Sequence, residues 1–401
     1  MKEYKYIILG AGIAGTSLAY FLSKSQAYED VLLLDANTSV ASEASGAAGA
    51  FLSPLLGKDN AFKTLVNNAL IFSTKFYSEN MPELYFPCGV LRLPKDIQDE
   101  NNFIDYEKYL DFTYKKIKNA YFFDIGALVF SSNICKALAK NTKTILEEKI
   151  LNIEYKDGLW NLEGTSNFKT ENLILCTGHK LKELINEPYL DLRELWGQRI
   201  DISTNLKFEH NYHKKCSLSK TYFSKKINQN IVSIGATHHR FTSNDEKNTF
   251  LKDQANLKNL CKNEILYKKG LNKDLDTLIS RAKEIAPLRD IKILDTFVGA
   301  RACSFDYFPF LGEIISSKNT LKVHKNIKNG LQVPKEKLEY HKNLFVFNGL
   351  GGRGFVLAPY LANVLASALT NKVLKQNDIL DEHLKKHLDL DGRFFKYARK
   401  L

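Results

Sequence analysis

The amino-acid sequence predicts an α/β protein in which a mainly parallel sheet, assembled from distant parts of the chain, is interrupted by a largely antiparallel sheet. Three observations predict this class. The 401-residue chain begins with an apolar strand, a glycine-rich turn and a helix. Another apolar strand, far along the chain, ends at Thr177-Gly178, and a later one runs into a further glycine-rich turn at Gly349. Between these strands lie segments that alternate polar with apolar residues, as in a sheet with one solvated face.

The first strand and turn form a dinucleotide-binding pattern. A buried strand is predicted over residues 4–9, a helix over 16–25 and a second strand over 31–34, which ends at Asp35. Between the first strand and the helix lies a GxGxxG turn made of Gly10, Ala11, Gly12, Ile13, Ala14 and Gly15. Strand, turn, helix and acid in this order predict a Rossmann-like domain that binds an ADP-containing cofactor.

Each residue of this pattern has a physical task. Gly10 permits the tight turn, Gly12 lets the backbone approach a pyrophosphate, and Gly15 lets the helix pack closely on the strand. The amides at the start of the helix would face the anion. Asp35, with Ala36 beside it, would accept hydrogen bonds from the ribose hydroxyls, which argues against a 2′-phosphate at that position.

The next elements follow from apolar spacing and small residues. Small residues after Asp35, among them Ser45, Gly46 and Gly49, suit a backbone that passes close to a flat ligand. The buried strand ending at Thr177 and Gly178 belongs near the cofactor, since ligands gather beyond the carboxyl ends of strands. Apolar spacing also predicts a helix over 61–77, a strand over 89–93, a helix over 132–140 and strands over 144–146 and 151–154.

The second half of the chain closes the nucleotide-binding sheet. Alternating strands are predicted over 198–237, helices over 246–261 and 274–286, and strands over 291–302 and 344–347. The last strand enters a turn and a helix over 355–369, with Gly349, Gly351, Gly352, Arg353, Gly354 and Phe355 at their junction. Amides of this turn would stabilise negative charge that develops on a reduced isoalloxazine ring. A first strand at one end and a last glycine turn at the other favour FAD over NAD.

These elements predict a discontinuous domain organisation. The FAD-binding domain is expected over residues 1–83, 122–185 and 288–401, and the substrate domain over 84–121 and 186–287. Two further features lie within the last part of the FAD domain: a polar insertion over 313–342 and a basic C-terminal tail over 383–401.

Composition limits the function classes. The formal charge is +12 and the pI about 9.1, which would attract a polyanion such as nucleic acid, although a general bias toward lysine on solvated faces gives the same composition. Six cysteines are scattered without a CxxC pair, so neither a metal site nor a disulfide framework is indicated. No signal peptide or membrane span is evident, and a cytoplasmic location is expected.

Several stretches resemble the glycine oxidase and sarcosine oxidase family of FAD-dependent amine oxidoreductases, and most closely the FAD domains of the MnmC family of bifunctional tRNA-modifying proteins. The resemblance covers essentially the whole chain. It is carried by Glu43–Leu56 (EASGAAGAFLSPLL), Ile234–Arg240 (IGATHHR), Val298–Pro309 (VGARACSFDYFP) and Gly349–Pro359 (GLGGRGFVLAP). The polar insertion and the basic tail point the same way, because small amino-acid oxidases usually lack both. The methyltransferase half of the bifunctional proteins has no counterpart in this sequence.

The resemblance implies an FAD-dependent enzyme that acts on the CH–NH group of its donor. The expected substrate is 5-carboxymethylaminomethyl-(2-thio)uridine at the tRNA wobble position, and the expected products are glyoxylate and the 5-aminomethyl base. Oxidation of the Cα–H bond would pass a hydride to the flavin, and water would hydrolyse the imine. FAD would be noncovalent, with no link to Cys303. A separate methyltransferase could act on the product.

The resemblance also implies site residues. Arg301 is the expected carboxylate clamp, because a guanidinium binds a carboxylate in a bidentate way; the alternative is a structural ion pair, perhaps with Asp306. Arg353 could add a second contact to the carboxylate or serve the flavin, or simply hold its turn. Substrate contacts are expected from Gln198, His239 and Arg240, although a His-Arg pair at a strand end is often only surface.

Two other functions compete with tRNA modification. An oxidase of free glycine, sarcosine or another small amino acid would use the same pocket without RNA. A flavin-binding accessory protein for tRNA or another macromolecule would show little turnover of its own.

Overall fold

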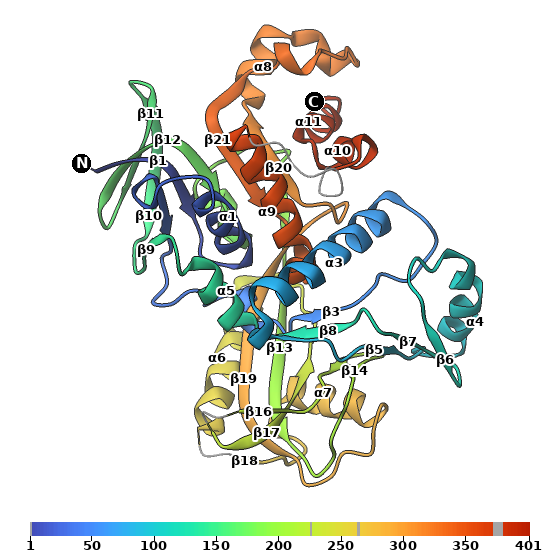
Figure 1. Ribbon diagram of the computed structural model, residues 1–401. Helices are drawn as coiled ribbons and strands as arrows, with labels where there is room; N and C mark the ends of the chain where they lie inside the picture. Colours follow the sequence, from blue (N-terminus) through green and yellow to red (C-terminus); the bar gives the residue numbers. More distant parts are fainter. Residues whose placement is uncertain (1, 225–226, 263–264, 372–379) are drawn as a thin grey trace. The chain divides into compact units, whose positions relative to one another are not determined.

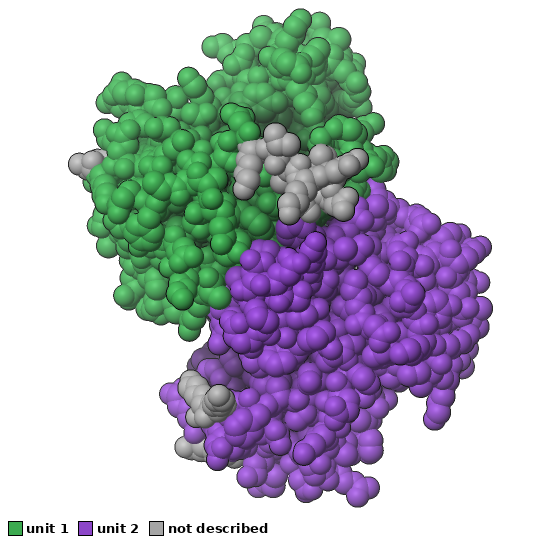
Figure 2. All heavy atoms as spheres, viewed as in Figure 1, with its two compact units in different colours: residues 1–42, 135–194, 301–401 green, residues 43–134, 195–300 purple. Residues whose placement is uncertain are grey.

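The computed structural model describes residues 2–224, 227–262, 265–371 and 380–401, which form two compact units (Figures 1 and 2). Unit 1 comprises Met1–Ser42, Cys135–Glu194 and Arg301–Leu401. Unit 2 comprises Glu43–Ile134 and Leu195–Ala300. Both units are discontinuous in sequence, as the predicted domains are.

The boundaries of the units differ from the predicted domain boundaries. Residues 43–83, 122–134 and 288–300 belong to unit 2 rather than to the N-terminal motif's unit, and residues 186–194 belong to unit 1. The small-residue stretch after Asp35 accounts for the first difference, because it packs on a strand of unit 2. The assignment of one unit to FAD and the other to substrate stays a prediction.

Unit 1 contains the parallel sheet that the sequence predicts. Strands β21, β12, β1, β2 and β9 lie side by side in that order and are parallel, whereas β20, β11 and β10 pair antiparallel at the sides. The strands of unit 1 are β1 (Lys2–Leu9), β2 (Val31–Leu34), β9 (Lys143–Ile145), β10 (Ile150–Lys156), β11 (Leu159–Gly164), β12 (Asn167–Leu175), β20 (Phe310–Ile315) and β21 (Tyr340–Asn348).

The central strands are apolar along their length because both faces of the sheet are covered. β1 is fully buried from Tyr6 to Leu9, and every residue of β2 is buried. The register places Leu9 beside Leu34 on one side and Leu175 on the other, so these three strands end together. The helices of unit 1 are α1 (Ile13–Ser23), α8 (Ser317–Val323), α9 (Gly354–Thr370), α10 (Glu382–Leu388) and α11 (Leu390–Ala398).

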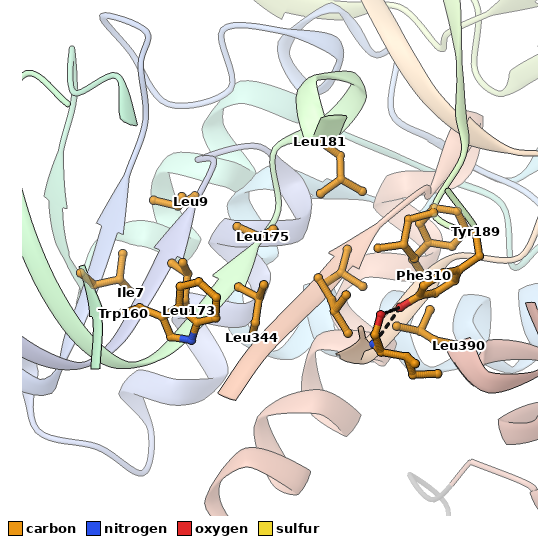
Figure 3. Packing of buried hydrophobic residues seen from close by; sticks show 14 of the residues in the cluster. Ile7, Leu9, Trp160, Leu173, Leu175, Leu181, Tyr189, Phe310, Leu344 and Leu390 are labelled. Atoms are coloured by element: carbon orange, nitrogen blue, oxygen red, sulfur yellow. Dashed lines mark hydrogen bonds between the residues drawn. The ribbon is translucent and has the colours of Figure 1, made fainter. Parts of the chain in front are cut away.

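The core of unit 1 extends from the parallel sheet to the C-terminal helices (Figure 3). Ile7, Leu173 and Leu344 come from the central strands, whereas Leu390 comes from α11. Tyr189 joins the two parts of the cluster: its hydroxyl donates to the Ile315 carbonyl at 2.9 Å and accepts from the Ile315 amide at 2.7 Å. Burial raises the pKa of this tyrosine above its usual range.

The predicted insertion and tail pack together in the same cluster. Ile327, Val333 and Leu338 of the insertion are buried with Phe394 and Ala398 of α11. We call residues 316–341 together with α10 and α11 the accessory layer. Its members therefore add to the core of unit 1, and the residues expected to form a tail are two docked helices.

Unit 2 contains a mixed, largely antiparallel sheet and a small three-stranded sheet. β19 (Lys292–Ser304), β13 (Leu192–Ser203) and β17 (Gln229–Gly235) are neighbours in the large sheet. Its other strands are β18 (Ile265–Leu266), β15 (Ser217–Leu218), β14 (Asn211–His213), β5 (Val90–Arg92), β7 (Ala120–Phe123), β6 (Lys115–Ile117) and β16 (Tyr222–Ser224). The small sheet consists of β3 (Phe51–Leu52), β8 (Ala127–Val129) and β4 (Tyr85–Phe86).

Helices cover the large sheet of unit 2 with an apolar face. Leu257 of α6 (Asn244–Cys261) and Leu275 and Leu278 of α7 (Lys273–Lys283) pack on Ile200 and Ile234 of the sheet. The remaining helices are α2 (Ala44–Ala47), α3 (Ala61–Asn80), α4 (Ile97–Tyr106) and α5 (Ser131–Ala139), the last of which continues into unit 1. Within the described ranges, we find no helix with the length and apolar character needed to cross a membrane.

Candidate functional site

The first glycine turn of unit 1 has the close backbone packing that its sequence predicts. A Cβ atom on Gly10 would lie 2.4 Å from the Cys176 carbonyl oxygen, and one on Gly15 would lie 1.9 Å from the Gly10 carbonyl oxygen. Gly10 also has a φ of +107°, which side chains disfavour. Gly12 precedes α1, whose N-terminus has no side-chain cap and no acid in its first turn. A helix N-terminus of this kind suits an anion such as a pyrophosphate.

Asp35 lies at the end of β2 and holds the turn together. Its Oδ2 accepts from the Ala11 amide at 2.6 Å, and its Oδ1 accepts from the amide and side-chain nitrogen of Asn37, each at 2.8 Å. Three of about four acceptor positions of the carboxylate are thus used inside the protein. One remains for a ribose hydroxyl, whereas Ala36 is simply exposed beside it.

The strand end at Thr177 and Gly178 lies against the first turn. Thr177 follows the Cys176 carbonyl that contacts Gly10, and its buried Oγ1 has no hydrogen-bond partner among the residues that the structure describes. The Gly178 carbonyl accepts from Asn348 Nδ2 at 2.9 Å, which ties this strand end to β21. The predicted position of this strand end near the cofactor stays a prediction.

The second glycine turn continues from β21 and starts α9. Gly349 and Gly351 have φ values of +75° and +57°, so side chains would strain both positions. A Cβ on Gly354 would lie 2.9 Å from Cγ2 of Ile13, at the start of α1. The two glycine turns therefore bring the first residues of α1 and α9 together, with Phe355 buried at the start of α9.

Arg301 lies on β19, within unit 1, beside this second turn. Its Cδ would be 3.8 Å from a Cβ on Gly352. Its Nη1 is buried and has no hydrogen-bond partner within the described parts of the chain. The alternative, an ion pair with Asp306, is not seen among the described residues, where Asp306 Oδ1 lies 3.0 Å from Nη2 of Arg393.

The electrostatics around the turn favour an anion. Burial lowers the pKa of the Arg301 guanidinium from its ordinary value. Burial also lowers the pKa of Arg353 in the same turn to about 10. A desolvated guanidinium is costly until an anion bonds to it. The structure thus places Arg301, on β19, beside the glycine turn that contains Arg353. The roles of both arginines in catalysis stay predictions.

The small-residue stretch with Ser45, Gly46 and Gly49 belongs to unit 2. Ser45 and Gly46 lie in α2, which packs so tightly on β19 that a Cβ on Gly299 would be 2.7 Å from the Ala44 Cα. A Cβ on Gly49 would be 2.3 Å from the Phe51 ring. Close packing explains the small size of Gly49 without a ligand, and the contact of all three residues with the cofactor stays a prediction.

The predicted substrate residues of unit 2 have structural partners of their own. Gln198 is fully buried in β13, where its Nε2 donates to Thr296 Oγ1 at 2.9 Å. His239 Nε2 lies 2.8 Å from Asp274 Oδ1, and its ring packs against Phe250 at a centroid distance of 5.0 Å. Arg240 is exposed. Roles for these three in substrate binding stay predictions.

Sequence reasoning missed one residue that shapes the site. Arg393, assigned to the basic tail, donates from Nη2 to Asp306 Oδ1 at 3.0 Å and to the Phe308 carbonyl at 2.9 Å. A signal was present: Leu390, Phe394 and Ala398 recur at four-residue spacing, which indicates a helix with a buried face.

The residues present fit FAD. The glycine turn and the amide end of α1 suit a pyrophosphate, and Asp35 has a free acceptor position for ribose. Thr177 offers a hydroxyl without a partner in the described structure, and the second turn places buried guanidinium charge in the same unit. Among the described residues, Thr177 Oγ1 and Arg301 Nη1 are buried without a hydrogen-bond partner, and the cofactor and an anionic substrate would supply one.

Comparisons with known proteins agree with this geometry. A family model described as FAD dependent oxidoreductase matches residues 5–368. The tRNA 5-methylaminomethyl-2-thiouridine biosynthesis bifunctional protein MnmC of Shewanella amazonensis is 25% identical over 396 residues, covering 90% of this chain and 56% of that protein. The protein of the same name from Campylobacter concisus is 24% identical, covering 92% of this chain and 56% of that protein. The chain thus spans little more than half the length of these curated relatives.

Solved structures show the same fold at low identity. Glycine oxidase from Geobacillus kaustophilus has a TM-score of 0.68 at 15% identity, covering 94% of this chain and 96% of that structure. Iminodiacetate oxidase from a Chelativorans species has a TM-score of 0.68 at 17% identity, covering 95% and 98%. The predicted glycine oxidase-like fold is confirmed by these likenesses, and the predicted FAD-dependent oxidoreductase is confirmed by the family model.

Proposed function

Because the chain belongs to the family of FAD-dependent oxidoreductases, we propose that it oxidises a CH–NH group, and that this group is the carboxymethylaminomethyl substituent of the wobble uridine in tRNA. The products are glyoxylate and a 5-aminomethyl-(2-thio)uridine. The name shared by the curated relatives, which refers to tRNA 5-methylaminomethyl-2-thiouridine biosynthesis, supports this choice of substrate.

One observation carries the proposal: the buried Nη1 of Arg301 has no partner in the described structure. The proposed substrate is an N-substituted glycine, so it ends in a carboxylate that this guanidinium can bind in a bidentate way. Arg353 adds positive charge to the same turn. Binding the carboxylate fixes the neighbouring Cα, which is the carbon to be oxidised.

Oxidation of the substrate needs no further reagent from the protein. FAD, when bound, would supply the acceptor for the hydride that leaves Cα. The substrate nitrogen contributes its lone pair to a C=N bond, and water then adds to that carbon. The C–N bond breaks, the oxygen stays with glyoxylate, and the primary amine stays on the base. The chain's own task is to hold the carboxylate and the amine in position, and no side-chain base is required because the neutral amine supplies the electron pair.

Other site residues take their proposed roles from position. The first glycine turn, Asp35, Thr177 and Gly178 hold the nucleotide part of FAD, and the turn from Gly349 to Phe355 serves its ring. Ser45, Gly46 and Gly49 take the predicted role of cofactor contacts, and Gln198, His239 and Arg240 that of substrate contacts. The primary amine product is a suitable acceptor for a separate methyltransferase. The tRNA substrate implies a cytoplasmic location.

The test uses the purified FAD-loaded chain and tRNA that carries carboxymethylaminomethyluridine. Nucleoside mass spectrometry should show aminomethyluridine, with glyoxylate formed in equal amount. Free glycine and sarcosine serve as competing substrates. Oxidation of these amino acids without conversion of the tRNA would make the chain a small-molecule amine oxidase. Flavin binding without turnover of either substrate would favour an accessory role.

A further inference from the structure

A turn that displays two aromatic rings follows Arg301 along the chain. Phe305 is 59% exposed and Tyr307 is 64% exposed, directly after the end of β19 at Ser304. Two aromatic rings are thus exposed two residues apart, at the end of the strand that carries Arg301. We call residues 305–307 the aromatic turn.

The aromatic turn is fixed from the C-terminal helices. Asp306 Oδ1 accepts from the Phe308 amide at 3.1 Å and from Arg393 Nη2 at 3.0 Å. The Phe308 ring is buried and stacks on His387 of α10, with centroids 4.7 Å apart and planes 13° apart. The rings of Phe305 and Tyr307 are therefore displayed on a backbone that the accessory layer holds in place.

The backbone at Tyr307 is strained, and neighbouring hydrogen bonds hold it in that conformation. Its φ is +68°, a conformation that is rare for a bulky side chain. Such conformations persist only where the surroundings impose them, and they gather at functional sites. Here the surroundings are the bonds of Asp306 and Arg393. The turn keeps an exposed ring in a costly conformation, although a glycine or asparagine would relieve it.

Phe305 also forms an arginine stack. The guanidinium carbon of Arg193 lies 4.4 Å from the centroid of the Phe305 ring. Arg193 Nη2 donates to the Ser304 carbonyl at 3.0 Å, which fixes the guanidinium plane. Aromatic rings and guanidinium planes are the two side-chain surfaces on which unpaired bases stack.

The accessory layer that holds the aromatic turn carries charge of the sign that RNA requires. Residues 316–341 contain two glutamates and six exposed lysines, Lys318, Lys322, Lys325, Lys328, Lys335 and Lys337. Lys335 pairs with Asp389, which leaves five. Lys396 and Arg399 are exposed on α11, the helix that supplies Arg393. A cationic surface beside stacking rings fits a single-stranded nucleic acid better than an apolar protein interface, which would lack this excess of lysine.

We propose that the aromatic turn stacks unpaired bases of the RNA substrate, and that lysines of the accessory layer bind its phosphates. This inference rests on the proposed function, because it takes tRNA as the substrate. It assigns Phe305 and Tyr307 to base stacking, Arg193 to support of that stack, and Arg393 to the position of the turn.

The test compares the affinity of FAD-loaded variants for tRNA that carries carboxymethylaminomethyluridine. Phe305→Ala combined with Tyr307→Asn removes both rings, and asparagine accepts the left-handed backbone at 307. Phe305→Tyr combined with Tyr307→Phe keeps both rings. Tyr28→Ala removes another ring of unit 1 that is 54% exposed. Loss of both rings should raise the Kd for tRNA about tenfold or more, whereas the other two proteins should stay within about twofold of the wild type.

Each outcome has a separate meaning. A wild-type chain that neither binds nor converts the tRNA would remove the proposed function, and this inference with it. Conversion by the wild type together with equal tRNA affinity after ring removal would overturn the inference alone. An equal loss of affinity in Tyr28→Ala would also overturn it. An unchanged flavin absorbance spectrum in the ring-free variant verifies that the protein is folded.

Discussion

Arg301 shows most directly how one residue connects this fold to its chemistry. Its partner in the sequence prediction was either a substrate carboxylate or Asp306. Among the described residues, Asp306 pairs with Arg393, and no ion pair between Asp306 and Arg301 is seen. What is left is a buried guanidinium nitrogen whose hydrogen bonds no described residue accepts.

We expect Arg301→Lys and Arg301→Ala to keep FAD and to lose turnover. A charge-assisted hydrogen bond is worth about 1.5–3 kcal/mol, so kcat/KM should fall by about 10- to 100-fold or more. Lysine should not rescue activity, because it lacks the planar fork. Steady-state kinetics would measure the effect, with the exposed Arg289→Ala as the matched control. Loss of flavin from Arg301→Ala would instead give the residue a structural role.

Single residues also show where sequence reasoning ends. The position of Asp35 after the second strand was predictable, because the motif has a fixed length. Its bonds to Ala11 and Asn37 were not, since they depend on how the turn folds back. The partner of His239 was equally hidden, because Asp274 lies 35 residues further along the chain.

The two glycine turns are the elements whose shape the sequence predicts best. Both depend on the absence of a side chain, and the structure shows what each side chain would hit. Gly15 is the sharpest case, because its neighbour is a backbone oxygen that cannot move aside.

Gly15→Ala should therefore reduce FAD occupancy and lower the melting temperature. The added Cβ would lie 1.9 Å from the Gly10 carbonyl oxygen, so the strand and helix must separate. Gly392→Ala is the matched control, because nothing lies within 4 Å of its Cβ position in α11. That change should leave FAD bound and stabilise the helix by about 0.5–1 kcal/mol. Equal melting temperatures for the two variants would contradict the packing argument.

The C-terminal helices were harder to predict. Their basic residues suggested a tail, and that reading ignored the four-residue spacing of Leu390, Phe394 and Ala398. The insertion was likewise described by its lysines, although Ile327 and Leu338 lie in the core. Both segments look polar in sequence because they contain few apolar residues, and those residues pack against each other in the core.

Phe394→Ala should destabilise unit 1 by about 3–5 kcal/mol, because the ring is fully buried. Urea unfolding followed by flavin fluorescence would measure the change. Lys396→Ala, two residues away on the exposed side of α11, should alter stability by about 0.5 kcal/mol or less. A similar small effect for both residues would show that α11 is not part of the cooperative core.

At the scale of the whole molecule, charge is the main property to test. A formal charge of +12 allows either RNA binding or a general excess of lysine, and composition cannot separate them. The structure makes the two explanations testable, because some exposed lysines belong to the accessory layer and others belong to unit 2.

Binding to tRNA should weaken as salt rises, with a slope set by the lysines that contact phosphate. Changing Lys322, Lys325 and Lys328 together to Gln should reduce the slope of log Kd against log salt by about 0.7–0.9 per lysine. The matched control changes three exposed lysines of unit 2, Lys252, Lys268 and Lys269. A larger effect in the control would place the RNA on unit 2.

Fold class was predictable at this scale, and boundaries were not. Periodicity identified the strands and helices that repeat apolar residues, such as β2 over Val31–Leu34. The predicted domains and the compact units differ most over residues 43–83, because the small residues after Asp35 gave no sign of packing on Gly299. Local patterns describe elements, whereas boundaries depend on which distant elements touch.

The interleaved path of the chain has a consequence for synthesis on the ribosome. β1 emerges before its neighbour β12, which starts at Asn167, and long before β21, on the other side of β12, which ends at Asn348. Pairings between such distant segments form slowly, because closing the long loop costs entropy before the contacts between the strands stabilise it. Until β12 has been made, β1 is an apolar strand without this partner, and exposed strands of this kind associate with other chains. A nascent chain halted before residue 348 would have both the GxGxxG turn and its acid, and still no complete sheet on which to hold a nucleotide.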